Sequence, residues 1–173
     1  MEVWAFDEHR AGLKPVLRRV WAPKGRRPVA AVHPRYEWLY LYGFVRPTSG
    51  AVEWFPCSAV NTALFAAVLA RFAEAVGAGA AKTVILVLDN AGWHGGGRLE
   101  PPEGVRLVFQ PPYSPELQPA ERLWPLAREA VANQHFAGLA DLDAALAARC
   151  LALRDQPEVV KAHTHFHWWP EAA

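Results

Sequence analysis

The chain has 173 residues, of which 52% are hydrophobic and 20% charged, and its formal net charge is +1 at pH 7. We expect one domain, residues 1–173, with a core large enough to fold without a disulfide or a structural metal. No run approaches the roughly 18 uninterrupted apolar residues of a membrane helix, and no basic stretch precedes an apolar one at the start. Cys57 and Cys150 are far apart and form no CxxC pair, which is typical of a reducing compartment. These features exclude a secreted or membrane-spanning class and predict a cytoplasmic protein.

Apolar runs bounded by turn residues predict five strands. We expect the first strand to end at Asp7 and Glu8, the next two to form a hairpin, and the fourth, an unbroken apolar run, to be buried on both faces. The predicted strands cover residues 1–8, 38–45, 51–56, 83–90 and 105–109.

Three helices complete the pattern. Asn61 is a suitable cap for a helix that reaches residue 76, where glycines follow. The proline turn at 111–115 leads into a helix over 119–131, and a last helix covers 139–153. The order of elements predicts an α/β fold with a mixed five-stranded sheet, antiparallel first and parallel later, flanked by helices.

One short segment is strongly basic. Five cations surround one tryptophan there, a composition that suits contacts to phosphates and stacking on bases. These residues are Arg18, Arg19, Trp21, Lys24, Arg26 and Arg27. A solvated loop without a ligand is the structural alternative.

Three acids from distant parts of the chain are candidates for one site. Asp7 and Asp89 follow apolar runs, and Glu121 stands early in the helix after the proline turn. Ligand sites of open α/β sheets lie at the carboxyl ends of strands, so neighbouring strands bring such acids together. Converging carboxylates repel one another unless a divalent cation binds them, and Mg²⁺ prefers such oxygen ligands. Each acid also has a structural alternative as a turn residue or a helix-cap residue.

Polar and aromatic residues stand close to the second and third acids. Asn90, Trp93 and His94 follow Asp89, and Tyr113 lies in the turn before Glu121. We expect these four residues to border a bound phosphate. For His94, a hydrogen-bonding role within its glycine-rich loop is the alternative.

Two blocks of the sequence resemble a known family. The segments VLDNAGWH and LVFQPPYSPELQPAERLW resemble the last two catalytic blocks of the DDE transposases of the mariner superfamily, in its bacterial insertion-sequence branch. The segment FDEHRAGLKPVLRRVWAPKGRRP resembles the first block, and the ending THFHWWP resembles the C-terminus of this branch. For that reason we do not interpret His163, His165 and His167 as a zinc site.

The resemblance implies a ribonuclease H-like fold and a metal-dependent endonuclease that also transfers strands. Asp7, Asp89 and Glu121 would be both the catalytic triad and the ligands of two Mg²⁺ or Mn²⁺ ions. The 31 residues between Asp89 and Glu121 match the spacing of such enzymes. The implied partners are DNA at transposon ends, a TA dinucleotide target and a second copy of the chain in a homodimer.

The sequence departs from the family at its start, because Met1 stands six residues before Asp7. We therefore expect the helix-turn-helix DNA-binding modules of such transposases to be absent from these residues. An upstream reading frame joined by frameshifting or a separate polypeptide would then supply them, or the chain is an inactive truncated relic. A ribonuclease H-like nuclease that cuts DNA without transposition is a further alternative.

Overall fold

The computed structural model describes residues 1–29, 31, 35–95, 99–112 and 114–171. Its strands are β1 (Glu2–Gly12), β2 (Trp38–Arg46), β3 (Ala51–Cys57), β4 (Val84–Leu88) and β5 (Val105–Phe109). Its α-helices are α1 (Thr62–Val76), α2 (Gly92–Gly95), α3 (Leu123–Ala127), α4 (Leu139–Arg154) and α5 (Pro157–Thr164). Three short 3₁₀ helices are η1 (Pro115–Leu117), η2 (Pro119–Arg122) and η3 (Arg128–Val131).

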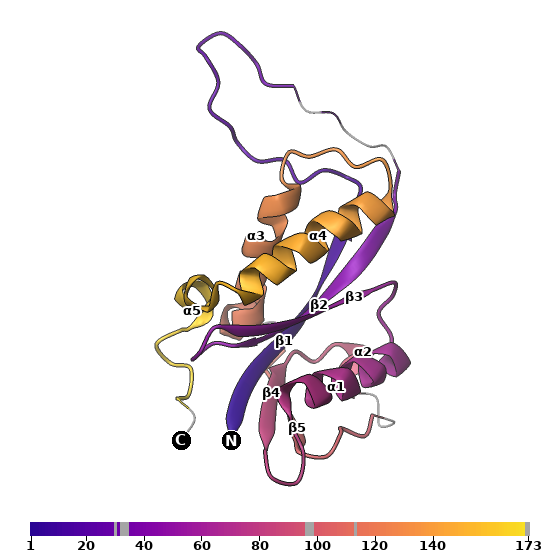
Figure 1. The fold of residues 1–173 in the computed structure, drawn as a ribbon, viewed down its shortest axis with the longest axis vertical. Coiled ribbons are helices and arrows are strands. Elements are labelled where there is room, and N and C mark those ends of the chain that lie inside the picture. Colours follow the sequence, from indigo (N-terminus) through magenta and orange to yellow (C-terminus); the bar gives the residue numbers. More distant parts are fainter. Residues whose placement is uncertain (30, 32–34, 96–98, 113, 172–173) are drawn as a thin grey trace.

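A single five-stranded sheet organises the described chain, in the order β3-β2-β1-β4-β5 (Figure 1). The strands β1, β2 and β3 are antiparallel neighbours, whereas β4 pairs parallel with both β1 and β5. The prediction of a mixed sheet, antiparallel first and parallel later, is confirmed. Among the described residues, no helix is both long and apolar enough to cross a membrane.

Helices cover both faces of the sheet (Figure 1). Side chains alternate along β1, so Trp4 and Phe6 pack in the cluster that contains the buried residues of α1, while Val3 and Ala5 pack in the cluster that contains α3, α4 and α5. Asn61 caps α1 as expected, since its side-chain oxygen accepts a hydrogen bond from the Leu64 N–H at 2.8 Å. The two clusters therefore lie on opposite faces of the sheet, and alternate residues of β1 belong to one or the other.

Two predicted boundaries are wrong. The first strand continues past Asp7 to Gly12, because β1 pairs with β2 as far as Gly12 opposite Trp38, so Asp7 lies within the strand. The helix predicted over 119–131 is η2, α3 and η3 in succession. Pro125 stands in its middle and has no N–H to donate to the preceding turn. The helix α5 has no counterpart in the prediction.

The basic segment belongs to residues 13–29, which we call the arm and which extend away from the sheet (Figure 1). Arg18 fastens the root of the arm: its backbone N–H donates to Asn133 Oδ1 at 2.8 Å, and its guanidinium pairs with Glu129. The guanidinium also donates to the carbonyl of Pro125 at 3.1 Å. The base of the arm is therefore joined to the α3 and η3 layer.

Glu2 ties the start of β1 to two neighbours. Its Oε1 lies 3.0 Å from the Arg46 guanidinium and 2.9 Å from Lys82 Nζ, and its Oε2 accepts from Trp4 Nε1 at 2.9 Å. Burial raises the pKa of Glu2, but the hydrogen bonds from Trp4 and Lys82 and the charge of Arg46 outweigh it and lower the pKa. A carboxyl whose pKa is lowered by folding stabilises the protein above its ordinary pKa.

We expect Glu2→Gln to reduce the free energy of unfolding at pH 7 by about 1 kcal/mol, since partly exposed ion pairs contribute modestly. The difference from wild type should shrink as the pH falls below the ordinary value of 4.5 and through the lower pKa of the folded protein. Urea unfolding at several pH values measures it. Glu74→Gln, which removes the exposed pair with Arg71 on α1, is the control and should have almost no effect. An equal loss for Glu2→Gln at all pH values would contradict the ion-pair explanation.

Candidate active site

Asp7, within β1, and Asp89, immediately after β4, stand at the same level along neighbouring strands. The parallel pairing of β1 with β4 ends at Ala5 opposite Val87, and each acid lies two residues further along its chain. Both acids are therefore directed to the edge where the two strands part. The strands that lead to the two acids are thus neighbours, which is the arrangement that brings two such carboxylates to one edge of a sheet.

A buried glutamine connects this opening to Glu121. The side chain of Gln118 donates from Nε2 to the carbonyl of Phe6 at 2.9 Å, a β1 carbonyl just beyond the last pair of the β1–β4 ladder. Gln110 similarly donates to the carbonyl of Leu117 at 2.6 Å. Because Gln118 immediately precedes η2, these hydrogen bonds fix the 3₁₀ turn that carries Glu121.

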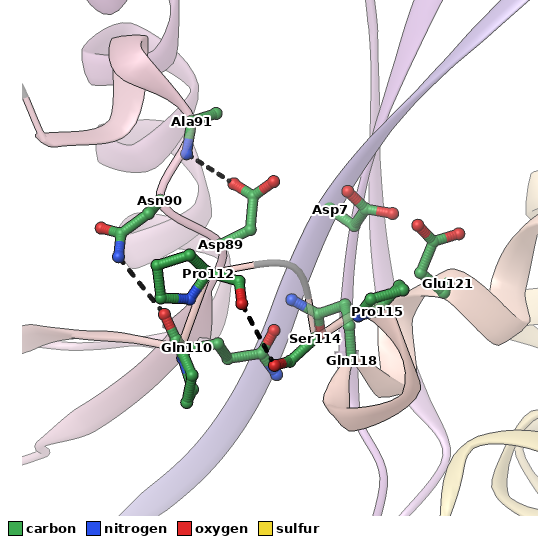
Figure 2. A pocket seen from close by; sticks show the side chains of 11 residues that line it. Asp7, Asp89, Asn90, Ala91, Gln110, Pro112, Ser114, Pro115, Gln118 and Glu121 are labelled. Carbon is green, nitrogen blue, oxygen red and sulfur yellow. Dashed lines mark hydrogen bonds between the residues drawn. The ribbon is translucent and has the colours of Figure 1, made fainter.

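The three acids line one cavity of about 470 Å³. Figure 2 shows Asp7 and Glu121 near one another and Asp89 further across the opening. The cavity is lined by Asp7, Asp89, Asn90, Ala91, Gln110, Pro111, Pro112, Ser114, Pro115, Gln118 and Glu121. The structure thus brings together all three acids that the sequence singled out.

The electrostatics around Asp7 disfavour its ionised form. Burial raises the pKa of Asp7 well above its ordinary value, and the nearby Glu121 raises it further. A hydrogen bond from Trp124 Nε1 to Asp7 Oδ2, at 2.7 Å, acts in the opposite direction. Burial also raises the pKa of Glu121. The charge of Arg128 lowers this pKa, and the charge of Asp89 raises it further. Crowded carboxylates of this kind are a frequent property of functional sites.

Asp89 is held differently. Its Oδ1 accepts from the Ala91 N–H at 3.0 Å and lies 2.8 Å from His94 Nδ1. The hydrogen bond from His94 lowers the pKa of Asp89, against partial burial. Asp89 is therefore the acid of the three whose surroundings favour the carboxylate.

The donor set fits a hard divalent cation, because three carboxylates line one cavity and such cations take oxygen ligands. Asp7, Asp89 and Glu121 would hold it. Within the described ranges, no three His, Cys, Asp or Glu side chains already stand close enough to hold a metal ion. The chemistry of the site thus suits a cation, while the carboxylates must approach one another to share it.

The other predicted residues have different places. Asn90 lines the cavity and donates to the carbonyl of Gln110 at 3.3 Å. His94 is only 1% exposed and, like Trp93, is not among the residues that line the cavity, so neither borders it as the sequence suggested. His94 instead faces Asp89 from behind, on the side of α1. Tyr113 lies outside the described residues.

The arm is separate from the cavity, since none of the described lining residues belongs to it. Arg18 is engaged at its root, as described above, and Trp21 is fully exposed. Arg19, Lys24, Arg26 and Arg27 are also exposed. The basic segment is thus a projecting surface and not a wall of the acidic site.

Sequence reasoning missed four residues that shape the site. Glu8 contacts His94, Gln110 and Gln118 brace the loop before Glu121, and Trp124 donates a hydrogen bond to Asp7. In the sequence, the signal that could have identified them is their position close to the candidate acids. Their partners are 7 to 117 positions away in the chain, so spacing alone does not identify them.

Gly43 lies opposite Asp7 in the β1–β2 ladder, directly under Trp124. A Cβ there would stand 2.8 Å from Cη2 of Trp124 and 3.2 Å from side-chain atoms of Leu123 and Trp54. We expect Gly43→Ala to displace the Trp124 indole from Asp7 and to destabilise the fold by about 1 to 3 kcal/mol, as overpacking does. Thermal unfolding and the NMR signal of the Trp124 indole N–H measure the two effects.

Gly79→Ala is the matched control, since nothing lies within 4 Å of the added Cβ and its φ is not positive. It should leave both measurements close to wild type. An unchanged indole signal in folded Gly43→Ala would show that the Trp124–Asp7 contact does not depend on this close approach.

Comparison with known proteins agrees with this geometry. The model of the family described as DDE superfamily endonuclease matches residues 2–143. An uncharacterized protein of Sinorhizobium fredii, y4pE/y4sA, is 34% identical over 121 residues, which cover 69% of this chain and 88% of that protein. The insertion element IS630 uncharacterized 39 kDa protein of Shigella sonnei is 27% identical over 137 residues, 77% of this chain and 39% of that protein.

Solved structures are similar in fold. The Mos1 strand transfer complex aligns with a TM-score of 0.60 and 16% identity, over 97% of this chain and 56% of that one. The catalytic domain of Mos1 mariner transposase aligns with a TM-score of 0.55 and 16% identity, over 97% of this chain and 84% of that one. The chain thus spans little more than half of the longer Mos1 chain and has the ribonuclease H-like fold of its catalytic domain. With a family match over most of its length, the chain belongs to the DDE superfamily endonucleases.

Proposed function

We propose that this chain is the catalytic domain of an insertion-sequence transposase, which cleaves DNA strands at transposon ends and transfers them to a target. The observation that carries the proposal is the convergence of Asp7, Asp89 and Glu121 on one cavity from β1, the end of β4 and η2. Two relatives support the DNA reaction: one is named as an insertion-element protein, and another was solved as a strand transfer complex.

In this proposal Asp7, Asp89 and Glu121 would together hold two Mg²⁺ or Mn²⁺ ions, with Asp7 as the central acid. When bound, such a pair activates a water and stabilises the leaving oxygen of a phosphodiester. Mos1 paired-end complexes have been solved with Mn and with Mg, which supports this choice of ion. Asp7 is the central acid because it lies on the middle strand of the sheet and beside Glu121.

The protein contributes orientation to each step. Trp124 holds the Asp7 carboxylate, the Ala91 N–H and His94 hold Asp89, and Gln118 fixes the turn that carries Glu121. A water attacks the scissile phosphorus in line with the leaving 3′ oxygen, which departs as a hydroxyl. That 3′ hydroxyl then attacks a target phosphodiester by the same displacement and breaks its bond to the 3′ oxygen of the target strand, which leaves as a hydroxyl. No bond to the protein forms.

Contacts with DNA outside the cavity are assigned to the arm. Arg19, Lys24, Arg26 and Arg27 would contact phosphates, and Trp21 would stack on a base. Arg18 anchors the arm through Glu129, and Asn90 borders the reacting phosphate from the wall of the cavity. The charge on the arm compensates for the acidity of the cavity that DNA must approach.

Sequence-specific reading of transposon ends requires contacts with base edges. We assign that task to a DNA-binding domain outside the 173 residues, carried by the same or a second polypeptide. Two copies of the catalytic domain would act on two paired ends, with a TA dinucleotide as target. The paired ends of the similar Mos1 complexes support the two-copy arrangement.

We expect Asp7→Asn, Asp89→Asn and Glu121→Gln each to reduce Mn²⁺-dependent nicking of supercoiled DNA by at least about 100-fold, since several kcal/mol of transition-state stabilisation would be lost. Joining of a 3′ hydroxyl oligonucleotide to a plasmid should fall equally. Glu116→Gln on η1 is the matched control, because this acid is not among the lining residues of the cavity.

The two assays separate the alternatives. Nicking without strand joining would favour a nuclease of the same fold over a transposase. No nicking by folded wild type together with the DNA-binding polypeptide would favour an inactive relic. Strong residual activity in Asp89→Asn would remove Asp89 from the site.

A separate prediction concerns the affinity of the arm for nucleic acid. We expect Lys24→Gln to weaken duplex binding regardless of sequence and to reduce the slope of log K against log salt by about 0.9, the value for one phosphate contact. Trp21→Ala should weaken single-strand binding by about 1 to 3 kcal/mol. Fluorescence anisotropy at several salt concentrations measures both. Trp168→Ala, at an exposed tryptophan of the C-terminal tail, should change neither value.

A further inference from the structure

His94 occupies a closed aromatic pocket behind the acidic cavity. It lies on α2, and the rings of Phe6, Phe65 and Trp93 surround it with centroid distances of 5.3, 4.7 and 5.7 Å. Its side chain is 1% exposed. A histidine enclosed in this way does not reach DNA or bulk water, so its role must act through the groups that it contacts.

Both ring nitrogens of His94 face carboxylates. Nδ1 lies 2.8 Å from Oδ1 of Asp89, and Nε2 lies 3.2 Å from Oε2 of Glu8, which is an ion-pair distance without hydrogen-bond alignment. The Glu8 side chain is 12% exposed, whereas that of Asp89 is 55% exposed. The ring therefore joins a mostly enclosed acid of β1 to an accessible acid at the end of β4.

The Glu8–His94–Asp89 contact lies beyond the point where β1 and β4 stop pairing. The β1–β4 ladder stops at Ala5 and Val87, before either Asp7 or Asp89. Glu8 follows Asp7 directly and points to the opposite face, with Phe6 and α1. A contact from Glu8 through His94 to Asp89 thus links the strand of one catalytic acid to the side chain of another.

From this arrangement we infer that His94 and Glu8 are positioning residues that set the orientation of Asp89 relative to Asp7, and thereby the ability of the two acids to share divalent cations. The inference rests on the proposed function of Asp7 and Asp89. An exposed aspartate has several rotamers available, and ordering it before a ligand arrives reduces the entropy lost on binding. Groups of this kind behind metal ligands typically change affinity or activity by 10- to 100-fold when removed.

The chemistry of the pocket favours positioning over stability as the reason for this bridge. A buried ion pair contributes little net stability, and apolar residues of similar volume often replace it without loss. The pocket already has Phe6, Phe65 and Trp93 around it, so an apolar side chain at residue 94 would suit it. A histidine held by two carboxylates instead gives Asp89 one defined direction.

Three variants separate the two contacts of the ring. His94→Leu removes both nitrogens, and Glu8→Gln removes the charge on one side only. His94→Asn keeps an amide N–H near the position of Nδ1, so it retains a donor for Asp89 and loses the contact with Glu8. His163→Asn is the matched control, because this exposed histidine bonds only to the Val159 carbonyl of its own helix among the contacts that the structure describes.

We expect His94→Leu to raise the Mn²⁺ concentration for half-maximal DNA nicking by about 10-fold or more and to lower the saturated rate, with the dissociation constant for DNA unchanged within twofold. His94→Asn should recover most of the loss, because it keeps a donor for Asp89. Glu8→Gln should show an intermediate loss, because the His94 ring is then free to turn. His163→Asn should match wild type. Wild-type Mn²⁺ dependence in folded Glu8→Gln, or a loss in folded His94→Asn of about 10-fold or more, would overturn the inference even if His94→Leu does not fold.

Crystal structures of His94→Asn and Glu8→Gln test the inference independently of activity. In His94→Asn, the Asp89 carboxylate should remain bonded to the Ala91 N–H and the new amide, while in Glu8→Gln the His94 ring should turn and carry Asp89 with it. An Asp89 side chain that keeps its orientation when the ring has moved would overturn positioning. If wild type itself neither binds Mn²⁺ nor cuts DNA, the proposed function fails, and these structures still decide whether His94 directs Asp89.

Discussion

The parting of β1 and β4 beyond Ala5 and Val87 is the constraint on which the site depends. Two parallel strands that separate leave backbone groups without ladder partners, and buried groups of that kind are costly. Gln118 satisfies one of them, the carbonyl of Phe6, and thereby places η2 at the opening. The same separation makes room for a cavity between Asp7 on β1 and Asp89 just beyond the end of β4. The separation of the two strands is therefore also what forms the site.

The site combines carboxylates in unequal surroundings. Asp7 and Glu121 are near one another, and burial raises the pKa of both. The charge of Glu121 raises the pKa of Asp7 further, and the charges of Asp89 and Glu8 raise that of Glu121. Asp89 stands apart from them and is stabilised as an anion by His94. Burial lowers the pKa of His94, but its contacts with Asp89 and Glu8 outweigh burial and raise it to about 9. In the proposed function, Asp89 is thus ready to bind a cation, while a bound cation would relieve the repulsion around Asp7 and Glu121.

The arm and the cavity divide the electrostatic work that the proposed reaction requires. An acidic cavity by itself repels a phosphodiester, so cations elsewhere on the surface are needed to bring DNA near it. The arm offers such cations and an exposed Trp21, and its root is held by Arg18 through contacts with the α3 and η3 layer. Because α3 also carries Trp124, the arm and Asp7 are connected through the same short helical layer.

The amino-acid sequence by itself determined the order and type of the main elements and the identity of the three acids. Period-two and unbroken apolar runs specify strands locally, Asn61 specifies a helix start, and the blocks around Asp89 and Glu121 identify the family. These signals are local, so they survive without knowledge of the packed structure. Only the tertiary structure decided that Asp7 lies inside a strand, that Pro125 divides the predicted helix, and that His94 faces Asp89 from a buried pocket. Such features arise from pairing and packing between residues distant in the chain, where partner geometry overrides local preference.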